Sequence, residues 1–128
     1  MADKPALQLL VSGPAKRDIA AILDWSLREF GEDAAERYDA LIRQALLDIR
    51  ANPERPGAQY RKELAEGVLV YPLRHSRERA RTRLGTVGNP RHFVIYRLRG
   101  LTVEILRLLH DAREIQRHLP PPDTPEQI

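Results

Sequence analysis

Two stretches near the start of the chain repeat apolar residues every three or four positions, which is the pattern of amphipathic helices. In the first stretch, one helical face carries Ile19, Ile22, Leu23, Ser26 and Phe30. Ser12 or Gly13 can cap this helix, Pro14 suits its first turn, and Gly31 is placed to end it. The sequence therefore predicts a helix from about residue 13 to residue 30.

The second stretch begins near Asp33 and stops before Pro53, because a proline disfavours helix at the residue before it. Its apolar stripe consists of Ala35, Tyr38, Leu41, Ile42, Ala45, Leu46 and Ile49. Two such helices joined by a few residues predict an antiparallel helical hairpin. Neither helix is stable alone, so each must pack its stripe against another element.

Four short apolar runs are typical of β-strands and span residues 7–13, 67–73, 92–98 and 102–109. Arg99-Gly100 predicts a tight turn between the last two. Pro72 indicates an edge strand or a bulge. Alternation along the last strand predicts that Ile105 and Leu108 point to opposite faces of the sheet.

Beyond the last strand, Asp111 can cap a short helix over residues 112–119. Residues 120–128 form a proline-rich, polar tail that we expect to be disordered. The order of elements predicts an α+β protein: an N-terminal strand and an antiparallel helical hairpin packed on a small antiparallel sheet, with a short C-terminal helix. We expect residues 1–119 to form a single domain.

Composition narrows the class of protein further. The 128 residues are 42% apolar and 30% charged, the balance of an ordinary globular protein, and contain no cysteine. The missing cysteine excludes disulfides, thiolate zinc sites and cysteine nucleophiles. No stretch approaches the roughly 18 apolar residues of a membrane span, and the N-terminus has no secretion signal of useful length. We expect a soluble, cytoplasmic protein that does not contact a membrane.

Positive charge is concentrated in the second half of the chain. The net charge is −2 over residues 1–56 and +5 over residues 57–128, and 18 of the 21 basic residues are arginine. Between two predicted strands, residues 75–92 read HSRERARTRLGTVGNPRH, with only Glu78 opposing the arginines. Hairpin connections are usually 2–5 residues long, so this loop is unusually long. It predicts a contact surface for an acidic partner; the alternative is a solvated insertion without a role.

Five segments together resemble the RelE/ParE superfamily of toxins from bacterial type II toxin–antitoxin systems. They are AKRDIAAILDWSLREFG (15–31), AAERYDALIRQAL (34–46), NPERPG (52–57), PRHFVIYR (90–97) and VEILRLLHDAREIQRHL (103–119). The last two are especially similar to the ParE branch. The resemblance covers about residues 7–119 and implies the fold predicted above.

The resemblance implies one of two functions. RelE-like members cut messenger RNA on the ribosome with lysine, arginine and tyrosine side chains, whereas ParE-like members poison DNA gyrase and lack that set. Here the corresponding strand, residues 67–75, has no lysine, and residues 109–119 have no tyrosine. The sequence therefore favours a toxin that binds gyrase, catalyses no reaction and needs no cofactor. The resemblance implies that a ParD-like antitoxin neutralises it and that it contacts DNA only through this antitoxin. The alternative is a ribosome-dependent mRNA endoribonuclease.

Candidate site residues follow from these two readings. Those expected to bind the target are Arg74, Arg77, Arg79, Arg81, Arg83, Arg107, His110 and Arg113. Those expected to bind the antitoxin are Trp25, Tyr38 and Tyr71. If the protein is a ribonuclease, the catalytic candidates are His75, Arg91 and His92, which must then converge in space. The histidines have no carboxylate at ligand spacing, so no metal site is expected.

Overall fold

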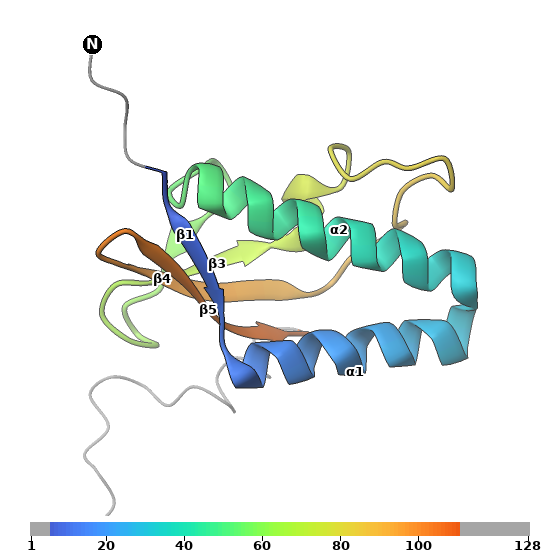
Figure 1. Ribbon diagram of the computed structural model, residues 1–128, viewed down its shortest axis with the longest axis horizontal. Helices are drawn as coiled ribbons and strands as arrows, with labels where there is room; N and C mark the ends of the chain where they lie inside the picture. The colour runs from blue at the N-terminus through green and yellow to red at the C-terminus, as the bar shows by residue number, and fades with distance from the viewer. Residues whose placement is uncertain (1–5, 111–128) are drawn as a thin grey trace, which may run out of the picture.

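A computed structural model describes residues 6–110, and in it two helices cover one face of a five-stranded sheet (Figure 1). The elements in chain order are β1 (Gln8–Val11), α1 (Gly13–Phe30), α2 (Glu32–Ala51), β2 (Gln59–Tyr60), β3 (Val68–Pro72), the 3₁₀-helix η1 (Leu73–Ser76), β4 (Phe93–Arg99) and β5 (Thr102–Leu109). This arrangement confirms the predicted α+β class. The predicted helix over residues 112–119 and the tail lie outside the described residues.

The sheet is mixed, with strand order β1-β5-β4-β3-β2. β1 pairs with β5 in parallel, and the other neighbours are antiparallel, so the prediction of a purely antiparallel sheet was incomplete. β2 was missed because it has only two residues within a turn-rich segment. Pro72 is the last residue of β3, beyond the part that pairs with β2, so its missing N–H interrupts no hydrogen bond on that side.

The helical hairpin forms as the pattern predicts. α1 ends at Phe30 and α2 begins at Glu32, which leaves only Gly31 between them. Gly31 has φ 92°, a conformation that residues with a Cβ rarely adopt, so the sharp reversal depends on glycine here. Neither helix within residues 6–110 combines the length and apolar character needed to cross a bilayer.

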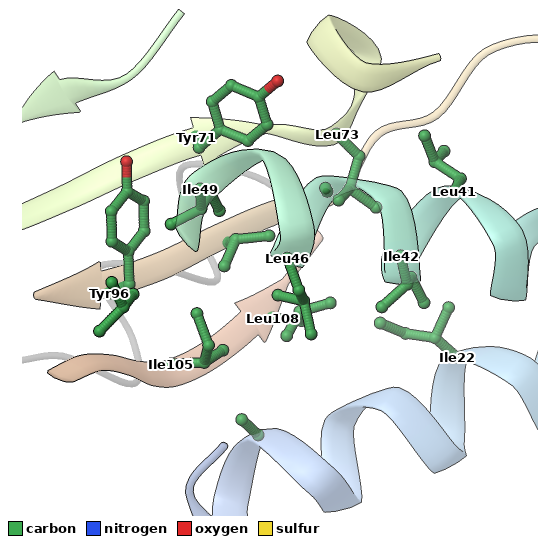
Figure 2. Close-up of a cluster of buried hydrophobic side chains, with 14 of the residues drawn as sticks. Ile22, Leu41, Ile42, Leu46, Ile49, Tyr71, Leu73, Tyr96, Ile105 and Leu108 are labelled. Atoms are coloured by element: carbon green, nitrogen blue, oxygen red, sulfur yellow. The ribbon is translucent and has the colours of Figure 1, made fainter. Parts of the chain in front are cut away.

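The main core lies between the hairpin and the sheet. The side chains that α2 contributes to it are Tyr38, Leu41, Ile42, Ala45, Leu46 and Ile49, all buried as the stripe predicts. Figure 2 shows several of them facing Leu73, Tyr96 and Ile105. Ala35 of the α2 stripe is only partly buried, and Phe30 of the α1 stripe is 66% exposed because α1 carries it to the tip of the hairpin.

The second face of the sheet has its own smaller core. Val68, Val70, Ile95 and Leu109 are buried there with Leu64 from the segment after β2. Toward β1 the same face becomes polar, where Glu104 accepts a hydrogen bond from Arg97 and forms an ion pair with Arg99. The sheet is therefore covered on its helix face and only partly apolar on the other.

A bulge in β5 overturns the predicted alternation along this strand. Ile95 pairs with Arg107 and Tyr96 with Ile105, so Leu106 is an extra residue without a partner in the register. As a result Ile105 and Leu108 both join the main core instead of pointing to opposite faces. A bulge depends on the partner strand, so alternation within one strand does not reveal it.

Ser12 ties the start of α1 to this bulge. Its Oγ accepts a hydrogen bond from the Ala15 amide at 3.1 Å, which caps the helix, and donates one to the Leu106 carbonyl at 2.9 Å. We predict that Ser12→Ala lowers the free energy of unfolding by about 2 kcal/mol, since it removes both bonds. Urea denaturation measures this, with Ser12→Thr as the control that keeps the hydroxyl. Equal stability of the alanine and threonine variants would contradict this assignment.

Candidate functional site

The arginine loop, residues 77–92, connects η1 to β4 and is built from short-range turns. It starts later than predicted, because Leu73–Ser76 forms a 3₁₀ turn that includes the first two residues of the predicted loop. Thr82 and Gly85 exchange two backbone hydrogen bonds of 3.1 and 2.9 Å. This tight turn places Arg83 at its tip, exposed to solvent.

Several contacts fasten the arginine loop to the rest of the protein. Arg77 donates to the Val87 carbonyl across the loop, and Arg37 of α2 donates to the Leu84 carbonyl at 3.4 Å. Val87 also packs against the main core. The loop is thus an anchored structure, and in Figure 1 it extends in yellow beside α2.

Asp48 of α2 is the strongest anchor. Its carboxylate is 2% exposed and accepts hydrogen bonds from Ser76 at 2.7 Å, Gln44 at 2.8 Å and Arg79 at 3.0 Å. The Arg55 guanidinium forms an ion pair with this carboxylate, with 3.8 Å between Nη1 and Oδ1. Burial alone would raise the pKa of Asp48, but these hydrogen bonds and the charge of Arg55 outweigh it and lower the pKa. Asp48 is therefore ionised and holds the loop through Arg79.

The structure separates the predicted target-binding residues by their surroundings. Arg107 forms a two-bond ion pair with Asp18 of α1, at 2.7 and 3.0 Å, and is only 22% exposed. Arg79 is held by Asp48 although 62% of its side chain is exposed, and Arg74 and Arg83 are exposed to solvent as well. The remaining predicted residues are the partly exposed Arg77, the exposed Arg81 and His110, and Arg113, which lies outside the described residues. Within residues 6–110, Arg74, Arg81 and Arg83 are thus exposed, whereas Arg107 is mostly buried in its ion pair.

A cavity of about 410 Å³ opens at the tip of the helical hairpin. Its apolar lining comes from Trp25, Phe30, Ala34, Tyr38 and Val87. Its polar lining comes from Ser26, Arg37, Asn89, Arg91, His92 and His110. The cavity thus joins α1, α2, the arginine loop and the residues that flank β4 and β5.

At the base of the cavity, Tyr38 and His92 form a buried pair. The Tyr38 hydroxyl and His92 Nδ1 share a 2.5 Å hydrogen bond, and the His110 ring lies edge-on to His92 at 5.1 Å. Burial and, to a smaller extent, His110 lower the pKa of His92 from 6.5 to about 4, while Asp18 opposes the shift. Burial raises the pKa of the Tyr38 hydroxyl to about 12. Both groups are therefore neutral near pH 7.

The low pKa of His92 predicts a loss of stability in mild acid. In the unfolded chain this histidine takes up a proton near pH 6.5, but in the folded protein only near pH 4, so stability falls as the pH drops between these values. The difference corresponds to about 3 kcal/mol. The control is His92→Gln, which keeps an acceptor for the Tyr38 hydroxyl. Urea denaturation should show that, from pH 7 to pH 4, the free energy of unfolding falls by about 3 kcal/mol more in the wild type than in this variant. Parallel pH profiles would contradict a buried, neutral His92.

The catalytic candidates do not gather at one place. Arg91 and His92 line the cavity, but His75 is not among its lining residues. The His75 ring lies 5.7 Å from the Tyr71 ring, and a Cβ at Gly57 would come within 2.7 Å of it, so only glycine fits there. Tyr71, an antitoxin-binding candidate, is fully buried with its hydroxyl 2.7 Å from Ser76 Oγ. Within residues 6–110, no group of three or more metal-binding side chains is arranged to hold an ion.

Sequence reasoning missed Asp48, Phe30 and Arg37 as parts of the site. An aspartate within an otherwise apolar helical stripe was a usable signal for Asp48, because a buried carboxylate requires partners. Phe30 and Arg37 carried no such signal, because their role depends on where the hairpin tip meets the arginine loop.

Comparison with known proteins places this architecture in the class of small toxins from toxin–antitoxin systems. Residues 9–115 match the protein family described as "ParE toxin of type II toxin-antitoxin system, parDE". Since this match spans most of the chain, the protein belongs to the ParE toxin family.

A solved structure has the same fold. The structure titled "Chromosomal ParDE TA system from P. aeruginosa" superposes with a TM-score of 0.61 at 16% sequence identity and covers 83% of this chain and 97% of that chain. The search of curated proteins gives no match. At this identity the superposition shows the shared fold alone.

Proposed function

We propose that this ParE family protein inhibits growth by binding DNA gyrase in the cytoplasm and that a cognate, ParD-like antitoxin neutralises it. The match over residues 9–115 carries this proposal. The protein reaches DNA only through the antitoxin. It acts as a binding protein and needs no cofactor.

The arginine loop supports a binding role. Asp48 and Arg37 fix the loop against α2, so Arg81 and Arg83 are held in place before any partner arrives. A preordered cationic surface loses little entropy on binding and speeds association with an acidic surface. We therefore assign the gyrase contact to the exposed arginines of this loop and to Arg74 beside it.

The chemistry of the cavity favours binding over catalysis. A general acid or base works best when its pKa lies near the working pH. His92 titrates near 4 and Tyr38 near 12, so neither is tuned for proton transfer at neutral pH. The burial that shifts both pKa values also shields the Tyr38 and His92 side chains from solvent.

A ribosome-dependent ribonuclease is the second candidate, because Arg91 and His92 line one cavity with His110. In that reading Arg91 would hold the charge developing on the phosphate and a histidine would accept the proton of the 2′-hydroxyl. His75 would take no part, since it lies outside the cavity.

Controlled expression in a bacterial host tests both candidates. We expect growth arrest with relaxed plasmid DNA and intact messages, reversed when the adjacent gene is expressed with the toxin. Arrest with cleaved messages and normal plasmid topology would instead support the ribonuclease. Growth unaffected by the expressed protein would contradict both.

A further inference from the structure

Two aromatic side chains form an exposed lip on the cavity at the hairpin tip. Phe30 is 66% exposed and Trp25 is 43% exposed, and their rings lie edge-to-face with centroids 5.4 Å apart. Exposed aromatic residues beside a hollow are typical of the central contacts of protein interfaces. This lip is not needed for the core, because both side chains lie outside it.

The inside of the cavity offers a mostly apolar wall. Ala34 and Val87 contribute aliphatic surface, and Tyr38 presents its ring while its hydroxyl is already bonded to His92. Because the buried Tyr38 hydroxyl has its partner within the protein, an apolar side chain can pack against this ring without leaving the hydroxyl unsatisfied.

The charges that line the cavity are positive. They belong to Arg37 and Arg91, and within the described residues no aspartate or glutamate lines it. Arg37 is fixed by its bond to the arginine loop, and Arg91 is exposed directly before His92. The acidic residues near the hairpin tip, such as Glu32 and Asp33, lie outside the lining.

We propose that this cavity receives a large apolar side chain from an acidic segment of the antitoxin. The inference rests on the proposed function, and adds the place and the chemistry of the contact. The apolar wall buries the side chain, the lip of Trp25 and Phe30 covers it, and Arg37 and Arg91 pair with acidic neighbours in the segment.

A polypeptide fits this cavity better than a nucleic acid does. Bases stack face to face on an open aromatic ring, whereas Phe30 already meets Trp25 edge-to-face. Two arginines also do not make the continuous basic track that a phosphate backbone follows.

Titration calorimetry of the purified antitoxin from the adjacent gene tests the inference with three toxin variants. Phe30→Ala removes half of the lip, Arg91→Glu reverses a lining charge, and Gly88→Leu adds a large side chain to the cavity lining at a position where an added Cβ meets no atom within 4 Å. Each should weaken binding at least about tenfold. Two controls should bind as the wild type does: Leu47→Ala, which truncates an exposed apolar residue outside this cavity, and Arg43→Glu, an exposed charge on α2.

The outcomes separate this inference from the proposed function. If the antitoxin binds the wild type and all variants equally, the site is overturned and the proposed function stands. If only Arg91→Glu binds normally, the acidic character of the segment is wrong. If a single-stranded oligonucleotide binds and the three variants weaken it while antitoxin binding is unchanged, the occupant is nucleic acid. Failure of the antitoxin to bind the wild type overturns the neutralisation proposal and this site together.

Discussion

Replacing Asp48 with alanine is expected to lower the free energy of unfolding by about 3 kcal/mol, the largest loss we predict for a substitution. The substitution leaves the buried Ser76 hydroxyl without its carboxylate acceptor. It also removes the ion-pair partner of the partly buried Arg55 guanidinium, which keeps its hydrogen bond to the backbone carbonyl of residue 48. Natural domains are stable by about 5–15 kcal/mol, so this loss is a large share of the total. Urea denaturation at neutral pH measures it.

A matched control is available on the same helix. Asp39 pairs with Arg43 at 2.8 Å, but Arg43 is exposed and Asp39 partly exposed, so Asp39→Ala should cost less than about 1 kcal/mol. If Asp48→Ala and Asp39→Ala destabilise the protein equally, Asp48 does not anchor the arginine loop. Truncating Arg79, which is 62% exposed, should have a much smaller effect than truncating Asp48.

Reversing the exposed charges of the arginine loop and of Arg74 beside it is expected to abolish most of the gyrase inhibition. In the triple variant Arg74→Glu, Arg81→Glu, Arg83→Glu, each reversed charge should remove about 1 kcal/mol of binding, so the inhibitory concentration should rise about 100-fold. Exposed arginines can be changed without disturbing the core, and the three leave the Asp48 network intact.

The control for this variant reverses three arginines on the helices. Arg28, Arg43 and Arg50 are exposed on α1 and α2, and their replacement with glutamate changes the net charge by the same amount. We expect this control to inhibit gyrase as the wild type does. Equal loss of inhibition in both variants would show that net charge, and not the arginine loop, determines the effect.

The helical hairpin was predictable because its determinants are local. The apolar stripe of α2, the proline at residue 53 and the glycine at residue 31 each act within a few residues of chain. The parallel pairing of β1 with β5 was not predictable in this way, because it joins segments more than 90 residues apart.

The candidate site was only partly predictable for the same reason. The sequence showed an arginine-rich loop, but not that Arg79 pairs with Asp48, 31 residues away, while Arg83 lies at an exposed turn. Similarly, Tyr38 and His92 are 54 residues apart, and only the packing of α2 against the start of β4 brings them together. Which arginines are structural and which are exposed is therefore decided by tertiary contacts.

The most direct test of the central claim is gyrase supercoiling of relaxed plasmid in the presence of purified, antitoxin-free protein, run beside an in-vitro translation reaction. Our account predicts that supercoiling is lost, that translation continues with intact message, and that added antitoxin restores supercoiling. Normal supercoiling with blocked translation and cleaved message would contradict it and direct attention to Arg91 and His92.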